Sequence, residues 1–301
     1  MTSEPKVFDW STHSAYSDPR GYADLLEAIP PDPAAVSETV RNIIVHYRGA
    51  NVELPEENRS DIDARWLSRT LDLDQSRHPG PLNTPREEAK RVQGCCRDHS
   101  LLATAILRQH GVPARNRVGF ASYFAPGYNV DHVIVEYRDG DRWRRFEPEV
   151  MGSLESLADP LDVPSGPAAP FVTAAEVWRG YRAGTLNINT YGVFPGSPIS
   201  GAWFVQGYVI LEVATRFGDE LLLWDGWGAM AAPDEPISEE LLALTDRLAD
   251  LLVRSDAGDE EAESELLEWY RSDDRLHPGP EVMRMSPFGD PPARESLTPP
   301  E

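Results

Sequence analysis

Residues 94–115, which read GCCRDHSLLATAILRQHGVPAR, decide the fold of this chain and contain both of its cysteines. Apolar residues recur here at spacings of three and four, which predicts a helix with one buried face. They are Leu102, Ala105 and Ile106. Gly111 predicts the end of this helix in a left-handed cap. Cys96 therefore falls at or just before the helix start, where backbone N–H groups and the helix dipole favour a thiolate.

A predicted antiparallel hairpin follows the helix. Residues 131–137 (DHVIVEY) alternate like a strand, Asp139 with Gly140 is a typical hairpin turn, and residues 142–147 (RWRRFE) return. Pairing about this turn predicts that His132 lies near residues 145–147. A helix followed by an antiparallel meander predicts the α+β class, with the cysteine-bearing helix packed on the sheet.

Further helices are predicted on both sides of this core. Their ranges are 33–47, 62–73, a short helix opened by Thr84 and Pro85, 173–183, 203–217, 241–253 and 262–270. We expect four parts along the chain. They are an N-terminal helical part of the core (1–83), the catalytic core (84–150), a helical extension packed on the core (151–277) and a disordered, proline-rich tail (278–301).

Composition excludes several classes of partner. The chain has 28 basic and 50 acidic residues, a net charge of −22, so we expect neither nucleic acid nor an anionic membrane as a partner. No apolar run is long enough to span a membrane, and the opening MTSEPKVFDW has no basic-then-apolar leader pattern. Two adjacent cysteines cannot link distant segments. We expect a cytoplasmic protein with reduced thiols.

Three side chains of this core could support nucleophilic catalysis. A cysteine nucleophile needs a base and a group that orients the base, and the chain offers Cys96, His132 and Glu147 in this order. Glu149 is the alternative acid. Cys95 is expected to be a packed thiol, and adjacent cysteines without a second cluster do not predict a zinc site.

Other polar residues near these segments have simpler interpretations. Asp98 is expected to be a first-turn helix charge, while His99 could still line the site. Asp131 is expected to cap or turn the strand start, and Gln93 is the nearest amide to Cys96 that could be a second oxyanion donor. Trp224, Asp225 and Trp227 could wall a cleft but are expected to form a core patch under a loop.

Three segments together resemble the transglutaminase-like superfamily. GCCRDHSLLATAILRQHGVPARNRVGF resembles its cysteine-helix motif, with Cys96 two places after Gly94. DHVIVEY resembles the strand that carries the family histidine, and DRWRRFEPE resembles the strand that carries the family acid. The resemblance covers roughly residues 84–150. It implies a papain-like α+β fold in which Cys96 is the nucleophile, His132 the base and Glu147 the acid, although glutamate replaces the usual aspartate and Val133 with Ile134 replaces the usual tryptophan.

The resemblance implies acyl-thioester chemistry on a small-molecule, peptide or protein carboxamide or acyl substrate, without a cofactor or metal. The reaction would be transamidation, amide hydrolysis or acyl transfer. One alternative is an acyltransferase similar to the arylamine acetyltransferases, although the negative charge of the chain disfavours coenzyme A phosphates. The other is a non-catalytic binding module that kept the fold.

Overall fold

The computed structural model describes residues 8–166, 168–233 and 235–300, and its residue contacts divide the chain into two units. The N-terminal unit comprises residues 9–116 and 133–164, and the C-terminal unit comprises residues 117–132 and 165–298. Two long strands, β3 (Ala114–Ala125) and β4 (Tyr128–Asp139), belong partly to each unit. Helices combined with mainly antiparallel strand pairs confirm the predicted α+β class.

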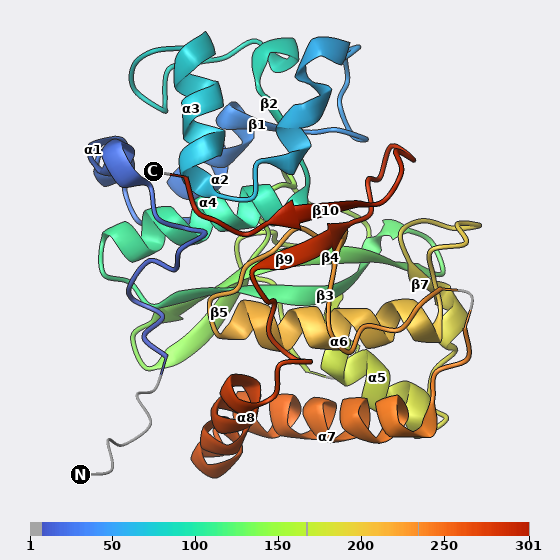
Figure 1. Cartoon of the computed structure of the whole chain (residues 1–301). Helices are drawn as coiled ribbons and strands as arrows, with labels where there is room; N and C mark the ends of the chain where they lie inside the picture. Colours follow the sequence, from blue (N-terminus) through green and yellow to red (C-terminus); the bar gives the residue numbers. More distant parts are fainter. Residues whose placement is uncertain (1–7, 167, 234, 301) are drawn as a thin grey trace. The chain divides into compact units, whose positions relative to one another are not determined.

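The N-terminal unit is built from short helices around the cysteine-bearing helix α4 (Figure 1). Its further elements are η1 (Arg20–Tyr22), α1 (Ala23–Glu27), α2 (Pro33–Ile43), β1 (Ile44–His46), η2 (Glu56–Asp63), α3 (Leu67–Arg77), η3 (Glu88–Lys90), β2 (Val92–Gly94), α4 (Cys96–Gln109) and β5 (Arg142–Phe146).

Helix α2 begins as its sequence predicts but ends earlier. Asp32 caps it by accepting hydrogen bonds from the N–H groups of Ala34 and Ala35, both at 3.1 Å, and Pro33 occupies the first turn. The prediction of a helix to residue 47 was wrong. The β-branched residues Ile44 and Val45 leave the helix and form β1, which pairs in parallel with β2.

The short helix predicted from Thr84 and Pro85 is also absent from the described residues. The side-chain amide of Asn42 donates to the carbonyls of Leu82 and Thr84 at 2.9 and 2.8 Å, and the Arg86 guanidinium donates to the same two carbonyls. These carbonyls are therefore not available to a helical ladder. The segment instead reaches Cys96 through the short turn η3 and strand β2.

Helix α4 is buried along almost its whole length. Every residue from Cys96 to Arg108 is buried, so the helix has no solvated face, although the sequence pattern required only one apolar stripe. Its end is the predicted one. Gly111 has a φ of +70°, and the N–H of Val112 donates to the carbonyl of Leu107 at 3.0 Å.

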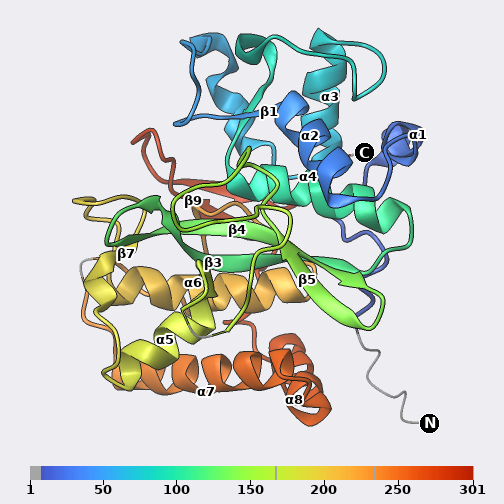
Figure 2. The same ribbon diagram turned by 180° about the vertical axis from the view of Figure 1, so that it is seen from behind.

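The predicted hairpin is present, and its register is defined. Strand β5 pairs antiparallel with the second half of β4, from Asp139 opposite Arg142 to Val135 opposite Phe146 (Figure 2). Gly140 in the tight turn has a φ of +58°. The carboxylate of Glu136 on β4 fixes this hairpin.

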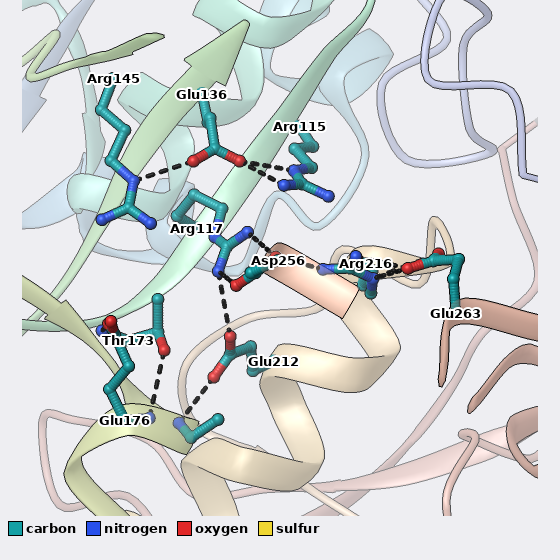
Figure 3. Close-up of polar contacts among 11 residues, drawn as sticks. Arg115, Arg117, Glu136, Arg145, Thr173, Glu176, Glu212, Arg216, Asp256 and Glu263 are labelled. Atoms are coloured by element: carbon teal, nitrogen blue, oxygen red, sulfur yellow. Dashed lines mark hydrogen bonds and ion pairs between the residues drawn. The ribbon is translucent and has the colours of Figure 1, made fainter. Parts of the chain in front are cut away.

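Buried ion pairs connect that carboxylate to two arginines. Glu136 accepts from Arg145 of β5 at 2.8 Å and from Arg115 at the start of β3 at 2.6 Å (Figure 3). The Arg115 guanidinium also lies 4.9 Å from the ring centroid of Trp10 and 4.4 Å from that of Trp143. These contacts fix the position of β5, which residue 147 directly follows.

In the C-terminal unit, strand pairs are covered by helices. Helices α5, α6 and α7 pack against one another, and α8 packs against α7 (Figures 1 and 2). The elements of this unit, besides its parts of β3 and β4, are β6 (Phe171–Thr173), α5 (Ala174–Arg182), η4 (Ile188–Thr190), β7 (Tyr191–Gly192), α6 (Ala202–Arg216), β8 (Asp225–Gly226), α7 (Glu239–Asp256), α8 (Glu260–Ser272), β9 (Glu281–Arg284) and β10 (Ala293–Ser296).

A glycine on β3 lets β6 approach closely. Gly119 pairs with Thr173, and a Cβ atom at residue 119 would lie 2.1 Å from the carbonyl oxygen of Val172. Only glycine fits there. Thr173 then caps α5 in a capping box with Glu176, whose carboxylate accepts from the Thr173 N–H at 2.8 Å.

A cluster of alternating charges, in which Arg117, Glu212 and Arg216 are buried, joins β3 to three helices. Arg117 of β3 donates to Asp256 at the end of α7 and to Glu212 of α6, the latter at 3.4 Å. Asp256 also accepts from Arg216 at 2.8 Å, and Arg216 pairs with Glu263 of α8 (Figure 3). The cluster fixes the helix ends because removing one partner would leave a buried charge unpaired.

The carboxyl group of Glu212 has an unusual pKa in this cluster. Burial, together with the nearby Asp256 charge, raises its pKa from 4.5 to about 7. The Arg117 charge and the Ala175 N–H, which donates to Glu212 at 2.8 Å, oppose this shift. The protonated form of Glu212 is thus favoured by the fold up to neutral pH.

The prediction that residues 278–301 form a disordered tail was wrong for the described part of that segment. Strands β9 and β10 form an antiparallel hairpin, and β9 also pairs with β8. Its backbone groups are satisfied by these pairings, and Val282 is 3% exposed. The proline-rich, charged composition concealed the pairing because backbone hydrogen bonds and one buried valine leave little compositional signal. In the part of the chain that the structure describes, no helix is long and apolar enough to cross a membrane.

We predict that Val282→Asp destabilises the protein by about 2 kcal/mol, because it places a carboxylate in a buried position of this hairpin. Met285→Asp is the matched control, because Met285 is 45% exposed. Thermal unfolding of both variants measures the effect. Equal melting temperatures for the two would contradict the docking of the hairpin.

Glu212 predicts a pH dependence of stability. Because its folded pKa lies above the unfolded value, its contribution is fully present below pH 4.5 and is lost as the pH rises through about 7. Glu212→Gln should remove this dependence, which amounts to at most about 3 kcal/mol. Denaturant unfolding between pH 5 and pH 8 measures it, with the exposed Glu268→Gln as control. Parallel stability curves for the wild type and Glu212→Gln would refute the prediction.

Candidate functional site

Cys96 is the first residue of α4, as the sequence predicts. Strand β2 ends at Gly94, and Cys95 is the extended N-cap residue of the helix. A side chain at residue 94 would collide with its surroundings, because a Cβ there would lie 2.9 Å from both an Ile44 methyl and the Asp98 carboxylate. Glycine therefore allows the strand to turn directly into the helix. The Cys96 backbone N–H is one of the first-turn donors that α-helical geometry leaves without an intrahelical acceptor.

The two thiols differ in their electrostatic surroundings. Both cysteines are buried, and neither is in a disulfide. A hydrogen bond with the Cys96 side chain lowers the pKa of Cys95, but burial and the Asp98 charge outweigh it, so the pKa of Cys95 lies above its usual value. Cys95 is thus a protonated thiol at neutral pH, as expected for a packed residue.

The first turn of α4 is held by Asp98. Its carboxylate accepts from the Cys95 backbone N–H and from the Arg97 guanidinium, both at 2.8 Å, which confirms its prediction as a first-turn helix charge. Arg97 also donates to the carbonyl of Arg65 at 2.5 Å. His99 Nδ1 donates to the carbonyl of Cys95 at 2.9 Å, so one ring nitrogen is occupied within the helix.

Hydroxyl and guanidinium groups fasten α4 to the adjacent strands within the N-terminal unit. Ser100 Oγ donates to the carbonyl of Val133 on β4 at 2.8 Å, and Thr104 Oγ1 donates to the side-chain carbonyl of Asn116 on β3 at 2.7 Å. The Nε of Arg108 donates to the carbonyl of Ala114 at 3.0 Å. The first of these bonds joins the second turn of α4 to the residue that follows His132.

His132 is the last residue of the segment 117–132, which belongs to the C-terminal unit. Its ring is buried against two neighbouring aromatic rings of β3, with centroid separations of 5.9 Å to Tyr123 and 4.9 Å to Phe124, both in edge-to-face arrangements. The preceding Asp131 accepts a 2.5 Å hydrogen bond from the hydroxyl of Tyr208 on α6. Asp131 lies inside β4, so the prediction that it caps or turns the strand start was wrong.

Glu147 follows β5 directly in the N-terminal unit and is fully buried. Its backbone N–H donates to the carbonyl of Pro160 at 2.7 Å, and its Oε1 accepts from the Glu149 N–H at 2.9 Å. The pairing of β4 with β5 ends with Val135 opposite Phe146, the residue directly before Glu147. A carboxyl group this deeply buried requires polar partners, which distinguishes it from a solvated strand-end residue.

Two further expectations from the sequence concern Gln93 and the segment around Trp224 and Trp227. The Gln93 amide nitrogen donates to the carbonyl of Pro55 at 2.8 Å, so one of its two hydrogens is already engaged. The backbone carbonyl of Trp224 accepts a hydrogen bond from the N–H of Met285, which follows β9. The indole N–H of Trp227 donates to the carbonyl of Leu276. Asp225 is buried and accepts from the Leu222 N–H at 3.2 Å, whereas both tryptophans are only half-buried, so the predicted core patch is present in part.

Sequence patterns gave no reason to select Tyr123, Phe124 or Tyr208. Aromatic residues on a strand or helix are ordinary core residues, and Tyr208 meets Asp131 across 77 positions of sequence. A metal centre has no candidate ligands among the described residues, because no group of three or more His, Cys, Asp or Glu side chains is placed to hold an ion.

Comparison with known proteins finds a similarity over the part of the chain that contains the candidate residues. Residues 50–148 match the sequence family described as the transglutaminase-like superfamily. No curated protein matches the chain significantly. A solved structure from Cytophaga hutchinsonii, named a "Putative Cysteine Protease", aligns with a TM-score of 0.34 and 16% identity. That alignment covers 57% of this chain and 53% of the other, about half of its length. The matched stretch of residues 50–148, which includes Cys96, His132 and Glu147, is thus similar to the transglutaminase-like superfamily.

Proposed function

We propose that the protein is a thiol enzyme in which Cys96, His132 and Glu147 form a catalytic triad. One observation carries this proposal: Cys96 opens a helix that is hydrogen-bonded to β4 at Val133, the residue directly after His132. The burial of Glu147, directly after the residue that pairs with Val135 of β4, supports the same arrangement. The family match supports a cysteine enzyme in general.

Each residue has one role in the proposed reaction. The Cys96 thiolate attacks the carbonyl carbon of a carboxamide, ester or thioester, after His132 has accepted the thiol proton. The Cys96 backbone N–H, at the positive end of α4, donates to the oxyanion that forms. His132 then protonates the leaving group, which for a carboxamide is an amine or ammonia, and Glu147 orients the imidazole and stabilises its charged form.

A second nucleophile completes the reaction by attacking the thioester on Cys96. Water would give hydrolysis, and an amine would give transamidation. The expected substrate is a small molecule, peptide or protein that presents a carboxamide or another acyl group, and no cofactor is required. The cytoplasmic setting expected from the sequence would keep the nucleophile reduced.

The acyltransferase alternative has a direct test. Incubation with acetyl coenzyme A and intact-mass analysis would give one acetyl group on Cys96 if the protein takes its acyl group from such a thioester. The net charge of −22 opposes binding of the anionic phosphates of that donor, so we expect no adduct. An acetyl adduct at Cys96 would replace the amidase or transglutaminase proposal with the acyltransferase.

The assignment of Cys96 over Cys95 predicts a selective alkylation. In Cys95→Ser, iodoacetamide should modify Cys96 well below the ordinary thiol pKa of about 8.5, because a catalytic thiol is ionised there. Serine is a good N-cap residue, so this variant should keep α4 intact. In Cys96→Ser, Cys95 should resist modification at the same pH. Fast labelling of Cys95 with slow labelling of Cys96 would reverse the assignment, and slow labelling of both would favour a non-catalytic binding module.

The role of Glu147 predicts a change in the reactivity of Cys96. Glu147→Gln should slow its alkylation at low pH, because the thiolate and imidazolium lose the carboxylate that stabilises them. Glu147→Asp should slow it as well if the backbone fits the longer side chain. Glu149→Gln is the control, and melting temperatures check folding. Wild-type rates in both Glu147 variants, with a slow Glu149→Gln, would transfer the role to Glu149.

A further inference from the structure

We propose that Cys95 and Cys96 together form a reversible oxidation site, at which hydrogen peroxide joins the two neighbouring thiols in a disulfide. This inference rests on the proposed function for the reactivity of Cys96, and it assigns a role to Cys95, which the catalytic reaction does not use. The oxidant belongs to the class of small peroxides, which can reach side chains that larger reagents cannot.

The two sulfur atoms are neighbours in space as well as in sequence. Adjacent residues can point their side chains apart, but here the Cys95 and Cys96 side chains hydrogen-bond to each other. Both are reduced and buried, and the chain contains no other cysteine. When one thiol is oxidised, the other is therefore the only protein thiol of the same chain that can react with it.

The chemistry balances with peroxide as the sole oxidant. The Cys96 sulfur attacks one peroxide oxygen, the O–O bond breaks, and the departing hydroxide takes a proton to become water, leaving a sulfenic acid on Cys96. The Cys95 sulfur then attacks the Cys96 sulfur and the S–O bond breaks. The thiol hydrogen of Cys95 leaves with the hydroxide as a second water. The two thiols lose two electrons in total, and one peroxide is reduced to two waters.

The surroundings of the two thiols divide the roles between them. Thiolates react with peroxide, and Cys96 lies at the first position of α4, where the helix dipole favours the thiolate. Burial and the Asp98 carboxylate keep Cys95 protonated. Cys96 is therefore oxidised first and Cys95 is the resolving thiol.

The product must be strained, and strain makes the modification reversible. Consecutive Cα atoms are about 3.8 Å apart, whereas disulfides ordinarily join Cα atoms at least about 4.4 Å apart. Such a bond is easily reduced by thiols. Its formation also distorts the backbone of Cys95, whose N–H is bound by Asp98. The disulfide thus blocks the Cys96 nucleophile temporarily and prevents its irreversible oxidation to the sulfinic acid.

One tryptic peptide reports the outcome. Residues 92–97 (VQGCCR) contain both cysteines. Trypsin releases this peptide because it cleaves after Arg91 and after Arg97. After treatment of the reduced full-length protein with equimolar hydrogen peroxide, this peptide should be two hydrogen atoms lighter and should resist iodoacetamide. Dithiothreitol should restore both its mass and its labelling.

Two variants make the test specific. In Cys95→Ser, Cys96 should accumulate as a sulfenic acid, which dimedone captures. Further oxidation should give the sulfinic acid, and dithiothreitol should then no longer restore the mass and labelling of the peptide. In Cys96→Ser, the peptide should keep its mass at the same peroxide dose. Circular dichroism checks that both variants are folded. A wild-type peptide that gains oxygen as fast as Cys95→Ser, without losing hydrogen, would overturn the proposal.

Failure of this inference is distinguishable from failure of the proposed function. Rapid alkylation of Cys96 at low pH without disulfide formation would remove only the oxidation site. Slow alkylation of Cys96 together with the lighter, reducible peptide would support the oxidation site and contradict the catalytic triad. The alkylation rate and the peptide mass are thus independent measurements.

Discussion

The carboxylate of Asp98 fixes the start of α4, and the chemistry assigned to the cysteines depends on this contact. It binds the Cys95 N–H and the Arg97 guanidinium at 2.8 Å each, so the cost of burying its charge is offset by two charge-assisted hydrogen bonds. The absence of a side chain at Gly94 leaves room for this carboxylate. Because the backbone of Cys95 is held in this way, the direction in which the Cys96 side chain leaves the helix is also determined.

Because α4 is buried on all sides, hydrogen bonds of its polar residues fix the position of the helix against the adjacent strands. A purely apolar helix could shift or rotate against the sheet at small cost, because hydrophobic contact is not directional. The hydroxyl of Ser100 on Val133 and that of Thr104 on Asn116 each have one acceptor at hydrogen-bond distance. A displaced helix would leave these groups buried without partners, at a cost of about 1–3 kcal/mol each. The polar contacts thus select one position of the helix relative to β4.

How much the sequence could predict follows from the range of the interactions. The helix start at Pro33, the turn at Gly140 and the placement of Cys96 at a helix start all depend on residues within one turn or one tight loop, and the structure has them as predicted. Strand β1 was mistaken for helix because its partner β2 lies 48 positions away, at Val92 for Ile44. Single-segment patterns contain no information about such pairings.

The same reason explains what was missed near the candidate site and at the chain end. The hydrogen bond from Tyr208 to Asp131 joins residues on different elements. Neither the tyrosine nor the aspartate, taken in its own segment, indicates that the other is its partner. Residues 281–296 have the charge and proline content of a tail, yet a few backbone pairs with β8 are enough to order them. By contrast, the proposed triad of Cys96, His132 and Glu147 could be selected from residue types alone, because a cysteine nucleophile needs a base and a group that orients the base.

Charge balance explains why the C-terminal unit can bury so many ionisable groups. Two arginines, Arg117 and Arg216, face three carboxylates, so the fully ionised cluster would hold one excess negative charge. Burial disfavours that charge, and the proton is taken by Glu212, whose pKa is raised to about 7. Asp98 and Arg97 show the opposite solution beside the cysteines, where each buried charge has its own counter-charge. The hydrogen bond with Cys96 lowers the pKa of the Cys95 thiol, but burial and the charge of Asp98 raise it above its usual value, and this supports the choice of Cys96 as the proposed nucleophile.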